Sequence, residues 1–291
     1  MGPAGASWQA GLPQVLAELA RRWHLTLGRP LPGGSASYVV AATSATGAAL
    51  VVKVCLPDPG LDAQAQTLVR ADGRGYARLV DYDATHGAML LERLGRSLEV
   101  SGRTPVEQLG VLARTLALAW QDPGDTAATP KAADLAVFIR GSWERLGRPC
   151  SERVVRQALV YAGRRAADPG EPVVVHGDPH PGNALAATAD RPGAATGYCF
   201  VDPDGFVADR AYDLGVALRG WSSQLTGSNA RAVAQSYAQV LAEHSGVDAT
   251  RIWEWGFVER VSTGLYVLEV VRSPAVARPF LRTAELLVDP A

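Results

Sequence analysis

The chain has 291 residues, of which 47% are hydrophobic, so it can bury a full core and divide into two lobes. Its formal net charge of −1 gives no reason to expect nucleic acid or an anionic membrane as a partner. No apolar run approaches the roughly 20 residues that cross a bilayer. Three widely spaced cysteines do not suggest a disulfide framework, so we expect a cytoplasmic protein with reduced thiols.

The first third of the chain is predicted to be mainly β-structure behind one amphipathic helix. Apolar residues at helical spacing predict that helix over residues 7–23. The period then changes, and apolar runs between turn residues predict strands. These strands cover residues 38–42, 48–54, 77–82 and 88–92, with a short helix at 61–70.

The remainder is predicted to be helical apart from one central β-hairpin. Its helices are expected at residues 105–120, 132–146, 151–167, 212–221, 230–245, 249–271 and 274–288. The plan is an α+β fold with an N-terminal lobe at residues 1–95 and a C-terminal lobe at residues 96–291. The boundary between the two lobes is expected near Gly95–Gly102.

The most informative stretch is a strand that opens into a rigid loop. The β-branched run Val173–Val175 is followed by Gly, Pro, Asp and His residues up to Asn183. Four residues separate Asp178 from Asn183, which is the spacing of the base and a metal ligand in D-x-x-x-x-N catalytic loops. Asp178 is therefore the candidate catalytic base.

A second acidic turn, Val201-Asp202-Pro203-Asp204-Gly205, ends another apolar run. Strands at 184–187 and 198–201 would form a hairpin that brings Asn183 and Asp202 to the same end of a sheet. An amide oxygen and a carboxylate suit a hard cation such as Mg²⁺. Together with a carboxylate free to take a proton, they predict phosphoryl transfer.

The early strands carry candidate nucleotide contacts. Small residues at 31–37 permit close approach of backbone N–H groups to phosphates, which makes Ser35 and Ser37 candidates, although an ordinary β-turn explains the loop equally well. Lys53 lies inside an apolar strand and therefore needs an anionic ligand or a carboxylate, unless the strand is at an edge and the lysine faces water. The helix at 61–70 offers Gln64 where kinases usually place a glutamate that pairs with this lysine.

These motifs, in this order, resemble the aminoglycoside phosphotransferase/choline kinase superfamily. The specific part is His176-Gly177-Asp178-Pro179-His180-Pro181-Gly182-Asn183, and the second acidic turn strengthens it. The resemblance covers nearly the whole chain. Within the superfamily, residues 34–40, 72–79 and 89–94 are most similar to the streptomycin (aminoglycoside 6-)/hydroxyurea phosphotransferase group.

The resemblance implies a bilobal protein-kinase-like fold and a role for each motif. Lys53 would contact the α- and β-phosphates of ATP or GTP, and backbone atoms of Glu92 and Leu94 would meet the base. Asn183 and Asp202 would hold Mg²⁺, while Asp178 would accept or orient the proton of the acceptor hydroxyl. Asp213 matches a helix-start carboxylate that braces the catalytic loop. The departure at Gln64 puts the rigid placement of Lys53 in question, unless a neighbouring carboxylate replaces the missing charge.

Several residues have more than one interpretation. His176 and His180 are either structural or metal ligands. Asp204 and Asp209 are either turn residues or contacts to metal or acceptor. Tryptophans 221, 253 and 255 belong to the core or line an acceptor pocket, and Glu254, Glu259 and Glu269 form a solvated face or make the site acidic.

The acceptor is expected to carry few charges, because bases and carboxylates nearly cancel over the chain. A guanidino-sugar such as streptomycin, a nucleoside or peptide antibiotic, and hydroxyurea all fit. The main hypothesis is a small-molecule kinase with a drug-resistance or metabolic role, and two rival hypotheses remain. One is a nucleotide-binding pseudokinase that senses a ligand, suggested by Gln64, and the other is a metallophosphoesterase, suggested by the Gly177-Asp178-Pro179-His180 segment.

Overall fold

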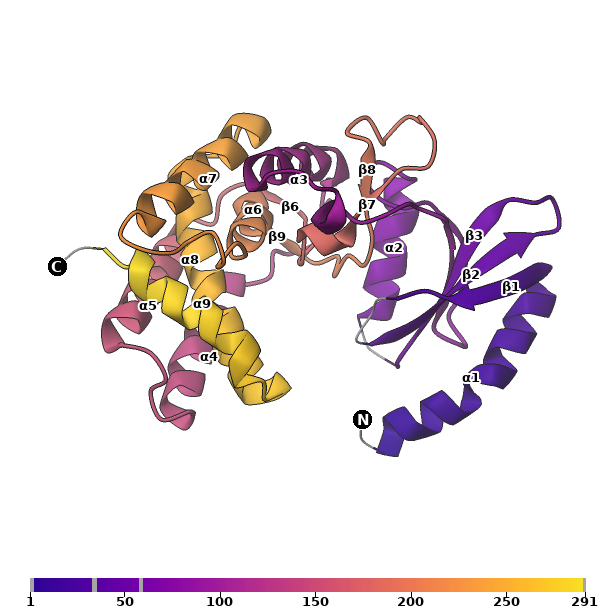
Figure 1. Cartoon of the computed structure of the whole chain (residues 1–291), viewed down its shortest axis with the longest axis horizontal. Helices are drawn as coiled ribbons and strands as arrows, with labels where there is room; N and C mark the ends of the chain where they lie inside the picture. The colour runs from indigo at the N-terminus through magenta and orange to yellow at the C-terminus, as the bar shows by residue number, and fades with distance from the viewer. Residues whose placement is uncertain (1–2, 33–35, 58–59, 290–291) are drawn as a thin grey trace.

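The N-terminal part of the protein is a five-stranded antiparallel sheet between two helices (Figure 1). This computed structural model describes residues 3–32, 36–57 and 60–289. The strands have the spatial order β1-β2-β3-β5-β4. Their bounds are β1 Leu25–Pro30, β2 Ser37–Ser44, β3 Ala49–Cys55, β4 Leu79–Asp83 and β5 Ala88–Glu92, and the two helices are α1 Pro3–Arg22 and α2 Leu61–Ala71.

Strand β3 is central and buried on both faces. It pairs with β2 over seven residues and with β5 over five. Because side chains alternate along a strand, Val52 and Val54 pack on the cluster under α1, whereas Val51 and Cys55 join the main core. Lys53 shares the face of Val51 and Cys55, and it lies opposite Val39 and Met89 in the two neighbouring strands. The edge-strand interpretation of Lys53 is therefore wrong.

The rest of the chain is mainly helical, as predicted, and confirms an α+β fold. Its helices are α3 Pro105–Ala119, α4 Lys131–Arg145, α5 Glu152–Ala167, α6 Arg210–Leu218, α7 Ala230–Ser245, α8 Ala249–Tyr266 and α9 Pro274–Leu287, with short turns η1 Leu98–Val100 and η2 Pro181–Asn183 and the π-helical turn η3 Val267–Val271. Helix α3 begins with a capping box in which Thr104 and Glu107 satisfy each other's backbone N–H groups. Helix α8 is buried almost all round and forms the centre of the helical part.

Two small antiparallel sheets position the predicted catalytic residues. Strands β7 Ala184–Ala186 and β8 Tyr198–Phe200 form the predicted hairpin. Strand β6 Pro172–Val174 pairs with β9 Val207–Asp209, a strand that was not predicted. The predicted helix 249–271 is interrupted, since its last turn is π-helical.

The segment at the predicted boundary runs along the hairpin. The Gly95 N–H donates to the Ala186 carbonyl at 2.8 Å, and the Ala186 N–H donates to the Arg96 carbonyl at 2.9 Å. Division of the chain into lobes at residue 95 stays a prediction. Within the described ranges, every helix is too short or too polar to cross a membrane.

Candidate active site

The catalytic loop after β6 is fixed by a buried carboxylate from α6. Asp213, in the first turn of that helix, accepts hydrogen bonds from the backbone N–H groups of His176 and Gly177, both at 2.8 Å. It also accepts one from Trp120 Nε1 at 2.9 Å. Burial raises the pKa of Asp213 to about 6, although these three donors oppose the rise. Asp213 therefore braces the loop, as the sequence predicted.

His176 is a structural residue of the same loop. Its ring is fully buried against Tyr76 and Phe200. Its Nδ1 accepts the Asp178 N–H at 3.1 Å, which places the proton on Nε2 for donation to the Val201 carbonyl at 2.9 Å. Burial lowers the pKa of His176 to about 4, so the ring is neutral near pH 7. Both ring nitrogens are used, and neither is available to a metal.

His180 also has a local role, because its Nδ1 accepts the Gly182 N–H at 3.1 Å. Its Nε2 lies 3.5 Å from Asp178 Oδ2. No three His, Cys, Asp or Glu side chains in the described part of the chain are arranged to hold a metal ion. The metallophosphoesterase hypothesis therefore lacks the ligand set that it requires.

Asn183 and Asp202 meet at one end of the β7–β8 hairpin. The Val201 N–H donates to the Asn183 carbonyl at 2.9 Å, which places the two candidate ligands in adjacent turns. Asn183 Nδ2 donates to the Asp178 carbonyl at 3.0 Å, which leaves its Oδ1 as the atom able to bind a cation. Asp202 has a left-handed backbone with φ of 59°, a conformation that aspartate tolerates better than most residues.

The donor chemistry of this pair suits magnesium. An amide oxygen and a carboxylate are hard ligands, and Mg²⁺ typically takes only one or two protein ligands and completes its shell with phosphates and water. The residues present therefore fit the ion that the sequence implied.

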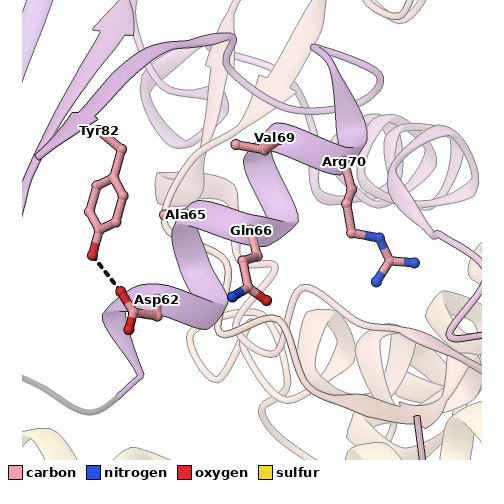
Figure 2. A pocket seen from close by; sticks show the side chains of 6 residues that line it. All are labelled: Asp62, Ala65, Gln66, Val69, Arg70 and Tyr82. Carbon is pink, nitrogen blue, oxygen red and sulfur yellow. Dashed lines mark hydrogen bonds between the residues drawn. The ribbon is translucent and has the colours of Figure 1, made fainter. Parts of the chain in front are cut away.

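Lys53 reaches this pair from the sheet. The side chain is buried, and its Nζ lies 2.8 Å from Asp202 Oδ1 and 2.8 Å from Gln64 Oε1. The carboxylate that a buried lysine requires is thus supplied by Asp202, while Gln64 adds a neutral acceptor. Asp62 does not replace the missing glutamate, because it accepts a hydrogen bond from Tyr82 on the outer side of α2 (Figure 2).

The remaining predicted nucleotide contacts occupy the segment after β5 and the start of β2. Glu92 uses its carboxylate structurally, accepting from the Arg78 N–H at 2.9 Å and from Arg191 at 2.5 Å. Leu94 is buried, yet its backbone N–H and carbonyl have no hydrogen-bond partner among the described residues. Ser37 begins β2 opposite Cys55. Ser35 lies outside the described residues.

Sequence reasoning missed Arg219, which holds the candidate base. From the C-terminal end of α6, its guanidinium donates to Asp178 Oδ1 and, at 3.0 Å, to Glu259 Oε2. The Glu259 side chain is only 5% exposed, whereas that of Asp178 is 40% exposed. A single arginine in a helical segment gives no local signal for this role. The only indication of this role in the sequence was Glu259, an acidic residue on α8 that needed a basic partner.

Asp209 and Asp204, the two aspartates with more than one interpretation, differ in whether their side chains have hydrogen-bond partners. Asp209 caps α6 by accepting the Ala211 N–H at 2.9 Å and also accepts from Trp255 Nε1 at 3.1 Å, so it is a structural turn residue. The Asp204 side chain has no hydrogen-bond or ion-pair partner within the described ranges. Although Asp204 is exposed to solvent, partial loss of hydration and then the charge of Asp178 raise its pKa to about 6.

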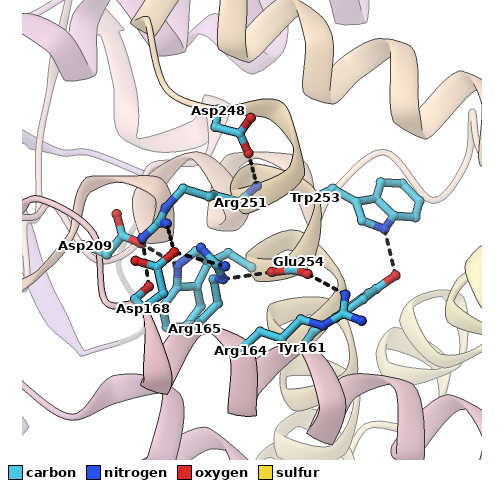
Figure 3. A network of polar contacts seen from close by, with 10 residues as sticks. Tyr161, Arg164, Arg165, Asp168, Asp209, Asp248, Arg251, Trp253 and Glu254 are labelled. Carbon is cyan, nitrogen blue, oxygen red and sulfur yellow. Dashed lines mark hydrogen bonds and ion pairs between the residues drawn. The ribbon is translucent and has the colours of Figure 1, made fainter.

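The aromatic and acidic residues of α8 are mainly core. Trp253 and Trp255 are buried. Glu254 forms ion pairs with Arg164 at 2.9 Å and Arg165 at 2.8 Å, in a polar network that Figure 3 shows. Glu269 pairs with Arg145 at 2.6 Å. Of the three glutamates, only Glu259 reaches the site, and it does so through Arg219.

Comparison with known proteins points to phosphotransferases, the class of enzyme that the arrangement of the site residues also fits. The family model described as aminoglycoside/hydroxyurea antibiotic resistance kinase matches residues 22–270. A streptomycin 6-kinase of Streptomyces griseus is 29% identical over 99% of this chain and 93% of its own length. A hydroxyurea phosphotransferase of Kitasatospora aureofaciens is also 29% identical, over 75% of this chain and 64% of its own.

Solved structures show the same fold. The choline kinase LicA from Streptococcus pneumoniae superimposes with a TM-score of 0.60 at 14% identity, covering 95% of this chain and 98% of the other. An aminoglycoside phosphotransferase from Streptomyces rimosus, in complex with ADP and streptomycin, gives a TM-score of 0.54 at 17% identity over 87% and 98% of the two chains. With the fold of these phosphotransferases and a family match over most of its length, this chain belongs to the aminoglycoside/hydroxyurea antibiotic resistance kinase family.

Proposed function

We propose that this protein transfers the γ-phosphate of ATP or GTP, with Mg²⁺, to a hydroxyl group of a small antibiotic. The observation that carries this proposal is the contact at 2.8 Å between Lys53 Nζ and Asp202 Oδ1, next to a catalytic loop that presents Asp178. A cation for phosphates, a ligand pair for magnesium and a proton acceptor lie together, which are the parts that phosphoryl transfer requires.

Each residue has a defined task in this proposal. Lys53 binds the α- and β-phosphates, and the unpaired backbone groups of Leu94, with those of Glu92, meet the base. Ser37 contacts the phosphates in this proposal, and Ser35, for which the same role is predicted, lies outside the described residues. Asn183 and Asp202 hold Mg²⁺, which neutralises charge on the phosphates when it is bound.

Asp178 orients the acceptor hydroxyl and takes its proton. Because Arg219 occupies Oδ1, the oxygen left for the hydroxyl is Oδ2, whose one polar neighbour in the described part of the chain is His180 at 3.5 Å. A carboxylate held on one side and open on the other is well suited to position a nucleophile for in-line attack.

The acceptor is proposed to be streptomycin or hydroxyurea. The names of the relatives support both compounds. Locally, the single positive charge of Arg219 is shared by two carboxylates, Asp178 and Glu259, so the surroundings of the base keep a negative charge. Over the whole chain, bases and carboxylates nearly cancel, and this balance supports an acceptor with fewer charges than a polycationic aminoglycoside. A cytoplasmic role in drug resistance follows from this proposal.

The test is a transfer assay over a panel of hydroxylated antibiotics with ATP and with GTP, followed by mass spectrometry of the acceptor. We expect Mg²⁺-dependent phosphorylation of streptomycin or hydroxyurea by the wild type. Asp178→Asn should lose at least ~10²-fold in turnover while it keeps its fold. Transfer to none of the acceptors, or unchanged turnover by Asp178→Asn, would refute the proposal.

A nucleotide-binding pseudokinase is the second candidate, because Gln64 replaces the usual glutamate. Tight Mg-nucleotide binding without phosphorylation of any acceptor in the panel would favour this candidate. The presence of Asp178 with an open oxygen argues for the enzyme, since a protein that only binds nucleotide has no need of a proton acceptor.

A further inference from the structure

Gln64 uses both ends of its side-chain amide at the active site. Its Oε1 accepts a hydrogen bond from Lys53 Nζ at 2.8 Å, and its Nε2 donates to the Pro203 carbonyl at 3.1 Å. Lys53 belongs to β3 and Pro203 to the acidic turn, 139 residues away from Gln64 in the chain. One side chain of α2 therefore connects the phosphate-binding lysine to the loop that carries a magnesium ligand.

These contacts close a ring. Pro203 directly follows Asp202, and Asp202 Oδ1 lies 2.8 Å from the same ammonium group that Gln64 accepts from. The position of Lys53 is thus fixed against Asp202 twice, once directly and once through Gln64 and the backbone of the acidic turn.

The acidic turn also packs tightly on α2 one helical turn further along. Gly205 has a φ of 72°, and a Cβ at this position would lie 2.2 Å from Thr67 Oγ1 and 2.9 Å from the Ala63 carbonyl oxygen. Only glycine fits there. This close approach holds the Pro203 carbonyl within reach of Gln64, so the amide bond is part of an extended contact between helix and loop.

A glutamate at this position could make only half of the contacts. A carboxylate accepts from Lys53 but has no proton to donate, so its second oxygen would face the Pro203 carbonyl, acceptor against acceptor. It would also give Lys53 a second negative partner beside Asp202, and that partner would compete with nucleotide phosphates for the ammonium group.

We propose that Gln64 is a positioning residue whose amide holds both Lys53 and the acidic turn Asp202–Gly205, so that this site requires glutamine rather than glutamate. The inference rests on the proposed phosphotransferase function. Gln64 then marks an altered way of placing the lysine and not a loss of activity. Lys53 keeps a single carboxylate partner, Asp202, and is otherwise available to the nucleotide.

The experiment compares steady-state kinetics of wild type, Gln64→Glu, Gln64→Met and Gln66→Glu. Methionine matches the length of glutamine without either hydrogen bond. Gln66 is exposed two residues further on and lines the outer side of α2, so Gln66→Glu makes the same change in charge on the same helix away from the site (Figure 2). Nucleotide KM, acceptor KM and kcat are measured separately, with the melting temperature of each variant.

Both Gln64 variants should lose roughly 10- to 100-fold in kcat/KM for the nucleotide. The acceptor KM and the values for Gln66→Glu should stay within about twofold of wild type. A merely structural role would lower the melting temperature and affect both substrates alike. Gln64→Glu with wild-type or higher kcat/KM would overturn the inference.

Failure of the proposed function would be recognised separately. If the wild type transfers no phosphate, the function is refuted, and calorimetric Kd values for Mg-nucleotide still test Gln64. Weaker binding by Gln64→Glu but not Gln66→Glu would then support its positioning role, and equal binding by both would refute it.

Discussion

At the scale of single residues, the candidate base is controlled by its partner Arg219. Although burial opposes the charge of this guanidinium, the carboxylates of Glu259 and Asp178 raise its pKa, so it stays protonated. Glu259 is almost inaccessible to water, and its ion-pair partner among the described residues is Arg219, beside a hydrogen bond with the Tyr212 side chain. Arg219 therefore couples the orientation of Asp178 to a buried ion pair, which makes it informative for mutation.

Arg219→Met should lower both turnover and stability. Asp178 loses the donor that fixes Oδ1, so we expect roughly a 10- to 100-fold lower kcat. Glu259 keeps the Tyr212 hydrogen bond but is left buried without a cation, which costs about 3 kcal/mol of unfolding free energy. Transfer assays and urea unfolding measure the two effects.

The double variant Arg219→Met/Glu259→Gln provides the control, because it removes the orphaned charge. Its stability should recover in large part while its turnover stays low. Full recovery of turnover in the double variant would show that Arg219 acts only through stability.

His176 should make stability depend on pH in a defined window. Its pKa is about 4 in the folded protein and 6.5 when exposed, so the unfolded chain binds the extra proton first as the pH falls. The contribution of His176 is complete above pH 6.5 and is lost as the pH falls toward 4. At about 1.4 kcal/mol per pH unit, this amounts to roughly 3 kcal/mol.

His176→Gln is the matched variant for this prediction, because an amide can replace both hydrogen bonds without titrating. Asp204 and Asp213, with raised pKa values, titrate in the opposite sense in the wild type and in the variant. The difference in unfolding free energy between the two proteins therefore isolates the histidine. A difference that does not change between pH 7 and pH 4 would contradict the burial of a neutral ring.

At the scale of elements, helix α6 organises the site. Asp209 caps its start, Asp213 in its first turn holds the loop that carries Asp178, and Arg219 at its end holds this candidate base. The loop has its observed shape because two of its backbone N–H groups point at one carboxylate. We expect the loop to lose its order when that carboxylate is changed.

Asp213→Asn should destabilise the protein and reduce turnover together. The amide cannot accept from all three donors, and each buried donor left unpaired costs ~1–3 kcal/mol. Trp120→Phe is the milder comparison, because it removes one donor and leaves the carboxylate and both loop contacts. Chemical unfolding and transfer assays should rank Asp213→Asn well below Trp120→Phe, and the reverse order would show that the loop does not depend on Asp213.

The sequence predicted helices and strands well where the pattern of apolar residues was long, and poorly where it was short. Most helices and the catalytic hairpin were found within a few residues, because their apolar periods extend over several turns or follow turn residues. Strand β9 has three residues, too few to show alternation, and the edge strand β1 was hidden by its Gly28 and Pro30. Neither error affected the predicted site.

The site itself was predictable only as far as its motifs are local. Asp178 and Asn183 share one loop, and Asp202 ends the hairpin that leaves it, so their meeting follows from chain order. The contacts of Arg219 with Asp178 and of Gln64 with Pro203 span 41 and 139 residues. No pattern along the chain reports such a pairing, which depends on how α6 and α2 pack in the finished fold.

At the scale of the whole molecule, one core joins the sheet to the helical part. The main cluster contains Val51 and Met89 from the sheet together with residues of α3, α6 and α8, whereas the cluster under α1 is separate. Arg191, from the loop between β7 and β8, adds polar contacts to the Gly73 and Tyr76 carbonyls and to Glu92. The sheet that carries Lys53 is thereby joined to the hairpin that carries the candidate magnesium ligands.

In the proposed function, Lys53, Asn183 and Asp202 together bind a magnesium nucleotide, whereas Asp178 serves only the transfer step. Calorimetric titration of ATP with Mg²⁺ into Asp178→Asn tests it directly, because this variant does not consume the nucleotide. We predict Mg²⁺-dependent binding that weakens at least ~10-fold when Lys53→Met or Asp202→Asn is added. Absent binding, or binding indifferent to magnesium and to both added substitutions, would contradict these roles of Lys53 and Asp202.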